Sequence, residues 1–131
     1  MVPLLLLACP KIDQQGWRSD QAEQIVLMEN AQMFWQGMRW KEPTRAMIFI
    51  EDPLERARFN VSFGQEEYID VKVLHAELND SESELNTEER WRWATVYVQI
   101  ESIESGYSVQ NREIEQSWYR TESGWFVDLK K

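Results

Sequence analysis

The only histidine in the sequence, His75, is the side chain best suited to acid–base chemistry near neutral pH. Its imidazole could act as a catalytic base if it faced a dry pocket, with Asp70 or Glu113 close enough to orient it. A single histidine on a strand is more often a surface or structural residue, and Asp70 shares its expected strand face with Lys72, as on a solvated edge. We therefore favour a protein without catalytic residues and keep an enzyme that uses His75 and a carboxylate as the alternative.

Metal and nucleophilic chemistry have little support in the sequence. Cys9 is the only cysteine, which excludes an intrachain disulfide and a cysteine-based zinc site. The acidic segment 79–89 (NDSESELNTEE) lacks the glycine and the ligand spacing of a calcium-binding loop, so a solvated loop is favoured over weak calcium affinity. Neither a G-x-S-x-G motif nor a glycine-rich phosphate loop occurs. We predict no metal site and no cofactor.

The composition is that of one soluble domain. The chain has 131 residues, of which 43% are hydrophobic and 28% are charged, enough to bury a core without disulfides. Its net charge of −9 repels phosphate backbones and anionic headgroups, so nucleic acid and direct electrostatic membrane binding are disfavoured as partners. Seven tryptophans in so short a chain predict that several indole rings are buried or half-buried.

A long alternating segment, residues 89–105 (ERWRWATVYVQIESIES), predicts the central strand of a β-sheet. Because side chains alternate along a strand, its aliphatic and aromatic residues fall on opposite faces. One face carries Ala94, Val96, Val98 and Ile100, and the other carries Trp91, Trp93, Thr95 and Tyr97. We expect the aliphatic face to pack against a helix and the aromatic face to point outward.

The part of the chain before this strand predicts helices. A helix that begins at residue 19 or 20 has apolar positions at three- and four-residue spacing for about 20 residues. Shorter helices are expected over residues 44–50 and 53–61, each close to a proline that suits a first helical position. In the second of these helices, we expect Leu54 and Phe59 to face inward.

Three further strands complete the expected sheet, over residues 68–78, 108–120 and 125–129. The apolar positions of the first change parity near Leu74 or His75, which predicts a β-bulge. Short turns join the last three strands, so we expect an antiparallel meander. The fold class is therefore α+β, with N-terminal helices packed on a curved four-stranded antiparallel sheet.

The order of helices and strands, the tryptophan-bearing first helix and the ending QSWYRTESGWFVDL resemble the nuclear-transport-factor-2-like superfamily, also called cystatin-like or SnoaL-like. The resemblance covers residues 19–129 and implies a sheet that curls around the helices into a cone-shaped pocket. Some members of that superfamily are enzymes, such as ketosteroid isomerase and scytalone dehydratase. The alternative function is accordingly an isomerase- or dehydratase-like activity at His75.

A pocket of this kind suits a small apolar or aromatic ligand. The side chains expected to line it are Trp35, Met38, Phe59, Val73, Val96 and Trp118. The tryptophans could also fill the pocket completely, which would leave a structural or protein-binding unit.

The outward aromatic face of the central strand is the expected interface. Trp91, Trp93 and Tyr97 together present more apolar area than a protein usually leaves exposed. We favour a homodimer or an envelope protein partner at this face. The alternatives are coverage by the N-terminal segment, or exposure with Arg90 and Arg92 stacked on the rings.

The N-terminal segment resembles the leader of small bacterial lipoproteins of unassigned function. Residues 6–9 (LLAC) look like a lipobox, in which a small residue precedes a cysteine that is lipidated. The division expected is a leader and linker over residues 1–18 and one domain over 19–131. A lipid on Cys9 would place the domain in the bacterial cell envelope, on the periplasmic side; the alternative is a cytoplasmic protein with an unmodified Cys9. Taken together, we predict a noncatalytic envelope lipoprotein domain that acts as a binding or assembly module.

Overall fold

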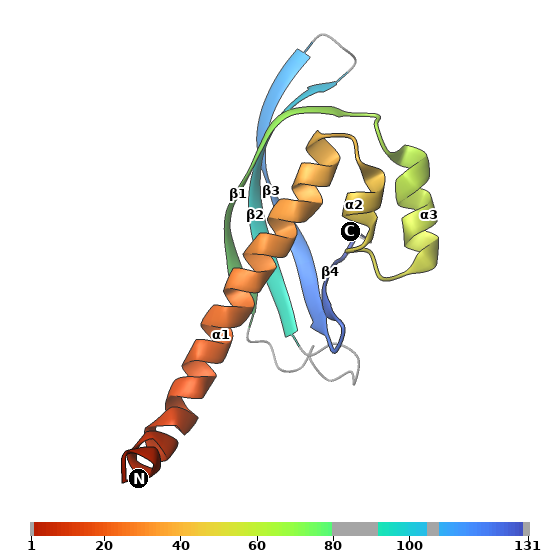
Figure 1. Cartoon of the computed structure of the whole chain (residues 1–131). Coiled ribbons are helices and arrows are strands. Elements are labelled where there is room, and N and C mark those ends of the chain that lie inside the picture. The colour runs from red at the N-terminus through yellow and green to blue at the C-terminus, as the bar shows by residue number, and fades with distance from the viewer. Residues whose placement is uncertain (1, 80–91, 105–107, 130–131) are drawn as a thin grey trace.

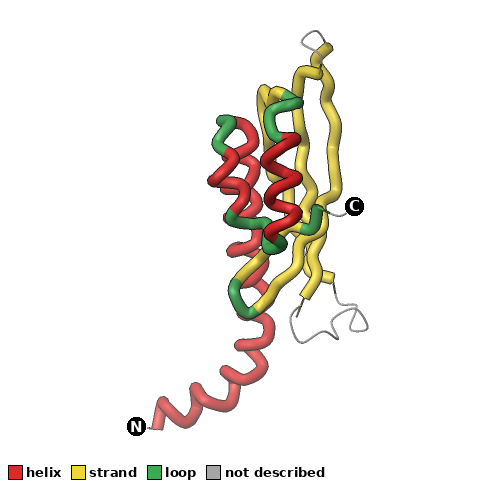
Figure 2. Tube along the Cα trace, turned by 90° about the vertical axis from the view of Figure 1, so that its right-hand side faces the viewer, coloured by secondary structure: helices red, strands yellow, loops and turns green. Residues whose placement is uncertain are grey.

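The computed structural model describes the backbone of residues 2–79, 92–104 and 108–129 and, within these ranges, the side chains from Asp20 onward except that of Glu104 (Figure 1). Three helices precede four strands, in agreement with the expected α+β class. The elements are α1 (Val2–Arg39), α2 (Pro43–Met47), α3 (Pro53–Ser62), β1 (Glu67–Asn79), β2 (Arg92–Glu104), β3 (Ser108–Thr121) and β4 (Gly124–Val127). The two ribbon views place all three helices on one face of the sheet (Figures 1 and 2).

The four strands form an open antiparallel sheet in the order β1-β2-β3-β4, which confirms the predicted meander. The pairing of β1 with β2 shifts between Val73 and His75, where the change of parity predicted a bulge. A second shift, between Tyr68 and Asp70, had no signal in the sequence. Both irregularities lie in β1, which is an edge strand of the sheet.

The core lies between α1 and the aliphatic face of β2. Ala94, Val96, Val98 and Ile100 are all buried there, as the alternation of the segment predicted. At the centre lies Trp118 of β3, whose ring contacts Phe34 edge-on with centroids 5.9 Å apart. The side-chain oxygen of Gln116 accepts a hydrogen bond from the indole of Trp118 at 2.9 Å and from that of Trp35 at 3.2 Å. Two large rings are thus buried without an unpaired indole N–H.

The first helix is longer than the capping signals indicated. It begins at Val2 rather than at residue 19 or 20, and the segment 10–18 that we expected to be a linker is helical. The four leucines and the alanine of residues 4–8 favour helix strongly, and this propensity extends the helix past the polar residues that could have capped it. The side chains of residues 1–19, including Cys9, lie outside the described side chains, and the division into a leader and a domain stays a prediction.

The third helix begins where the sequence indicated. Pro53 is its first residue, and the side chain of Asp52 accepts a hydrogen bond from the Leu54 amide at 3.0 Å. Phe59 packs against the core, with its ring 6.1 Å from that of Phe34. Leu54, however, is 58% exposed, so the expectation that it faces inward was wrong. Leu54 and Phe59 are five residues apart, so their side chains point about 140° apart around the helix axis. They therefore cannot share one face.

Candidate functional site

A hollow of about 580 Å³ lies where α1 ends and β1 begins. The C-terminal end of α3 and the connection from α3 to β1 form its remaining walls. The chain reverses there at Gly64, whose φ of 89° is a left-handed conformation that glycine adopts without strain. The lining residues are Met38, Lys41, Phe59, Ser62, Phe63, Gly64, Gln65, Glu66 and Tyr68. Its apolar wall is therefore largely aromatic.

A polar network borders this hollow. Arg112 of β3 donates two hydrogen bonds to Glu66, one to each carboxylate oxygen, at 2.7 and 3.0 Å. Ser102 of β2, which is fully buried, donates its hydroxyl to the same carboxylate at 2.5 Å. The planar guanidinium matches the two oxygens of the carboxylate, so this pair is fixed in orientation as well as in charge.

The network shifts the pKa of both acidic groups that line the hollow. The hydrogen bonds from Arg112 hold the pKa of Glu66 below its usual value, against the opposing effect of burial. Burial, followed by the charge of Glu66, raises the pKa of Tyr68 to about 12. At neutral pH, Glu66 is therefore ionised and Tyr68 keeps its proton.

The charges around the hollow cancel in pairs. Glu66 is neutralised by Arg112, and Lys41 lies 3.9 Å from the carboxylate of Glu67 in an exposed ion pair. The hollow therefore offers aromatic and apolar walls beside a fixed polar pair, without a large excess of either charge.

The six side chains expected to line one pocket are divided among three places. Met38 and Phe59 line the hollow just described. Trp35 and Val73 line a separate hollow of about 280 Å³ between α1 and β1. Val96 and Trp118 are fully buried in the core. The tryptophans thus fill the middle of the fold and leave open space at its margin.

Sequence reasoning did not include Phe63, Glu66, Tyr68 or Arg112 among the site residues. One signal could have pointed to Arg112. Arg112 lies at an alternate position of β3 that shares the inward face with Ile114 and Trp118. A charged side chain on such a face requires a partner. Nothing in the local pattern indicates that this partner is Glu66, which lies 46 residues earlier in the chain.

His75 lies on the outward side of β1. Its side chain is 57% exposed and its ring stacks on that of Tyr97, with centroids 4.4 Å apart. The carboxylate beside it is that of Glu77, at 3.7 Å, rather than that of Asp70 or Glu113. His75 lines a wide surface hollow between α1 and β1 and does not line the one that holds Glu66. The enzymatic alternative therefore has to use an exposed imidazole.

The expected interface residues make contacts within the chain. Trp93 is half-buried and lies 5.4 Å from the ring of Tyr119, which also contacts Phe126. Tyr97 donates its hydroxyl to Glu77 at 3.0 Å, and this hydrogen bond raises the pKa of the phenol. Trp91 lies outside the described residues. The aromatic rings of this face thus cover part of one another, and a partner at this face stays a prediction.

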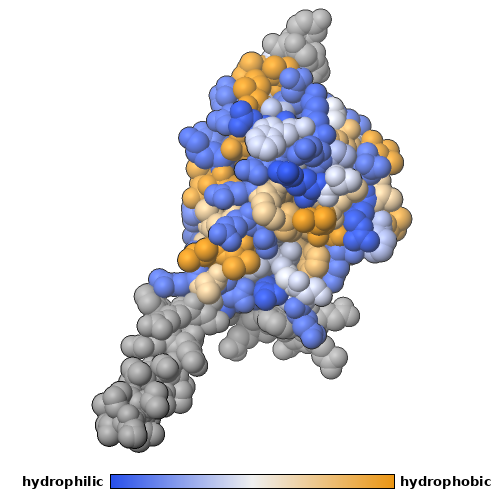
Figure 3. Space-filling view, in the orientation of Figure 1, coloured by the Kyte–Doolittle hydropathy of each residue, from blue (hydrophilic) through white to orange (hydrophobic). Residues whose placement is uncertain are grey.

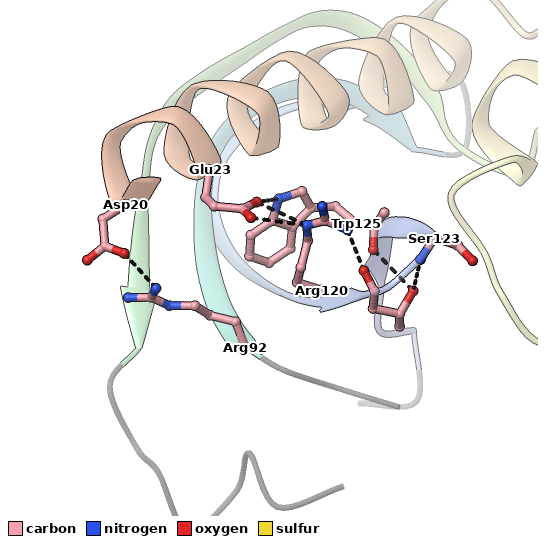
Figure 4. Close-up of polar contacts among 8 residues, drawn as sticks. Asp20, Glu23, Arg92, Arg120, Ser123 and Trp125 are labelled. Carbon is pink, nitrogen blue, oxygen red and sulfur yellow. Dashed lines mark hydrogen bonds and ion pairs between the residues drawn. The ribbon is translucent and has the colours of Figure 1, made fainter. Parts of the chain in front are cut away.

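A second polar network lies where α1 leaves the sheet (Figure 4). Glu23 accepts hydrogen bonds from Arg120 at 3.0 Å and from the indole of Trp125 at 3.1 Å. One helical turn earlier, Asp20 pairs with Arg92 at 2.7 Å. These contacts fasten one helix to three different strands, and none of these residues lines the hollows beside α1 described above.

The surface on the side of the helices is mostly hydrophilic, with separate apolar patches (Figure 3). Within the part of the chain that the structure describes, no group of histidine, cysteine or carboxylate side chains is placed to hold a metal ion. In the same part, no helix combines the length and the apolar character that crossing a membrane requires.

Comparisons with protein-family models, with curated proteins and with solved structures found no match.

Proposed function

We propose that this protein is a noncatalytic binding module whose site is the hollow between α1, α3 and β1. The observation that carries the proposal is the combination of open volume, about 580 Å³, with an aromatic wall and a fixed Glu66–Arg112 pair. This volume lies within the range of small-molecule sites in proteins. We further propose that the sheet and helices belong to the nuclear-transport-factor-2-like type, for which the resemblance implies a cone-shaped pocket.

The ligand class follows from the lining. Phe59, Phe63 and Tyr68 offer faces and edges of rings, which bind flat apolar groups. The charges of the site are paired, so a strongly charged ligand would leave its own charge without a partner. We propose an uncharged ligand with an aromatic or alicyclic body and one polar group directed at Glu66 and Tyr68.

A neutral fluorescent probe tests this site. N-phenylnaphthylamine emits strongly in apolar surroundings, and we expect it to bind the full chain with a saturable, single-site curve. Ser62→Trp places an indole in the hollow and should weaken binding at least about tenfold. The matched control is Val61→Trp on the same helix, because Val61 is 84% exposed and does not line the hollow. Equal binding by both variants would reject the site.

We also propose that the module is tethered to the bacterial envelope through a lipid on Cys9. The support is the lipobox-like segment over residues 6–9. The test is the intact mass of the protein produced in a Gram-negative host, measured beside Cys9→Ser. Loss of residues 1–8 together with the added mass of acyl chains, in the natural sequence alone, is the expected result. An unmodified mass for both proteins would reject the tether and leave the binding site unaffected.

A further inference from the structure

The edge strand β1 has a neighbour on one side only. It pairs with β2 and ends the sheet order, so the opposite side of its backbone faces away from the sheet. An unpaired edge of this kind can accept another strand, and many proteins protect it with bulges and charges. β1 has bulges, since its pairing with β2 shifts after Tyr68 and again after Val73. It also carries charged side chains on its outward face.

The charges on the outward face of β1 follow a definite order. The register with β2 places six residues on this face, in chain order Glu67, Asp70, Lys72, His75, Glu77 and Asn79. Asp70 and Lys72 lie on either side of Val71, carry opposite charges and are both exposed, with no bulge between them. We call these two residues the charge row.

A row of this kind is complementary to an antiparallel copy of itself. When two β1 strands run antiparallel about a twofold axis at Val71, Asp70 of each lies opposite Lys72 of the other. Opposite charges directly across an antiparallel pair stabilise it, whereas a parallel copy would place like charges side by side.

The charges of this row have only weak competitors within the chain. Asp70 lies 3.6 Å from Arg39, and Glu67 lies 3.9 Å from Lys41, in exposed pairs that contribute little. Lys72 makes no ion pair within the described residues. His75, by contrast, lies 3.7 Å from Glu77 and stacks on Tyr97. Asp70 and Lys72 are therefore the groups that a second copy would contact.

The inward side of the same edge has apolar surface left to cover. A hollow of about 280 Å³ lies between α1 and β1, and Val71 and Val73 form part of its wall. Trp40, at the end of α1, lines this hollow and is 56% exposed. The twofold axis at Val71 would bring the two hollows and the two Trp40 rings together. Apolar contact on one side of the edge would thus add to charge pairing on the other.

We propose that the edge of β1 pairs with β1 of a second copy of this chain, antiparallel and centred on Val71. The pair joins two four-stranded sheets and occupies the free edge of each β1. The bulges on either side restrict regular pairing to residues 70–73. The charge row sets the register, because a shift of two residues would oppose Asp70 to Asp70 or Lys72 to Lys72.

The test uses sedimentation velocity on full-length chains with altered charges. The natural chain should form a dimer in a concentration-dependent manner. Because of the twofold axis, the contact between residues 70 and 72 occurs twice in the dimer. Either substitution, Asp70→Lys or Lys72→Asp, makes both contacts like-charged and should raise the dissociation constant about tenfold or more. A one-to-one mixture of the two variants should dimerise again, because each row of one chain is then complementary to that of the other. Circular dichroism confirms that each variant is folded.

The control carries the same charge change two strands away. Glu115→Lys alters an exposed residue on the outward face of β3 and should leave the dissociation constant unchanged. A natural chain that stays monomeric up to its solubility limit would overturn the proposal. So would a dimer that both charge reversals leave intact, since contact would then occur elsewhere, for example at the aromatic outer face. Failure of the mixed variants to associate would also overturn it.

Discussion

Two carboxylate–arginine pairs fasten the two ends of this fold, and both arginines come from the same face of β3. Arg112 holds Glu66 at one end, and Arg120 holds Glu23 at the other. Eight residues of strand separate the two arginines, roughly 26 Å along an extended chain. The carboxylates are similarly shielded, with 19% of the Glu66 side chain exposed and 24% of that of Glu23. The chemistry of the two pairs is thus nearly the same.

The two ends differ in what lies next to each pair. At the Glu23 end, the indole of Trp125 donates to the same carboxylate, and its ring is buried against the sheet. At the Glu66 end, the neighbours are the open hollow and the half-buried ring of Tyr68. A similar ion pair therefore fastens a helix in one place and borders a hollow in the other. Packing around the pair, rather than the pair itself, decides which end has open space beside it.

The largest effect is expected when the Glu23 network is broken. Glu23→Ala removes the acceptor of Arg120 and of the Trp125 indole, and should lower the free energy of unfolding by about 2–3 kcal/mol. Asp20→Ala, which breaks an exposed pair with Arg92, should cost less than about 1 kcal/mol. Urea unfolding measures both. If the two variants lose equal stability, the Glu23 network does not fasten this end of the fold.

The equivalent change at the open end should cost less and depend on pH. Glu66→Gln weakens the contact with Arg112 and should lower the free energy of unfolding by about 1–2 kcal/mol at neutral pH. Because the folded-state pKa of Glu66 lies below its unfolded value, its contribution is complete above about pH 4.3 and is lost as the pH falls through the folded pKa. Urea unfolding over this range should show the difference between the two proteins shrinking in acid. A constant difference would contradict the role of the charge.

A smaller effect is expected at Gly37, where α1 and α2 pack closely beside the open end. An added Cβ would lie 3.0 Å from the Ala46 nitrogen and 3.1 Å from the Glu42 oxygen, both backbone atoms. Moving the two helices apart to relieve that contact would lower the free energy of unfolding by about 1–3 kcal/mol. The higher helix propensity of alanine over glycine would raise it by about 1 kcal/mol. Gly37→Ala should therefore lower the free energy of unfolding by about 1 kcal/mol. A stabilised variant would mean that the two helices can separate freely.

The smallest effect is expected at Lys41, on the rim of the open end. Its φ of 58° is left-handed, which costs a residue with a side chain about 1 kcal/mol. Lys41→Gly removes this cost but adds flexibility to the unfolded chain, and the pair with Glu67 is weak. We expect a gain of up to about 0.5 kcal/mol in thermal unfolding, with probe binding unchanged. A loss of stability would show that the Lys41 side chain supports the rim.

The parts of the fold with regular periodicity could be predicted from the sequence. The alternation in β2 placed its four aliphatic residues on the buried face, and a change of parity located the bulge before His75. These are local patterns of side-chain direction, which the backbone geometry fixes. The start of α1 could not be placed in the same way, because polar residues that suit a cap can also lie inside a long helix.

The candidate site depended on contacts that no local pattern encodes. Trp118 and Val96 are apolar, as residues that line a pocket often are, yet close packing around them left no space. Glu66 lies in a short connection and meets Arg112 only because the sheet brings β3 beneath the end of α1. Open volume is what remains after all side chains have packed, so it follows from the whole fold rather than from any one segment.

The most direct test of ligand binding at the open end is a nitrogen–proton NMR titration of the full chain with N-phenylnaphthylamine. Each end of the fold has its own reporters, namely the backbone amides of Phe63–Tyr68 at one and the indole N–H of Trp125 at the other. We predict saturable shifts confined to the amides around the hollow, with the Trp125 indole unmoved. Shifts at the Trp125 end or on the outward face of the sheet, or none at all, would contradict the account.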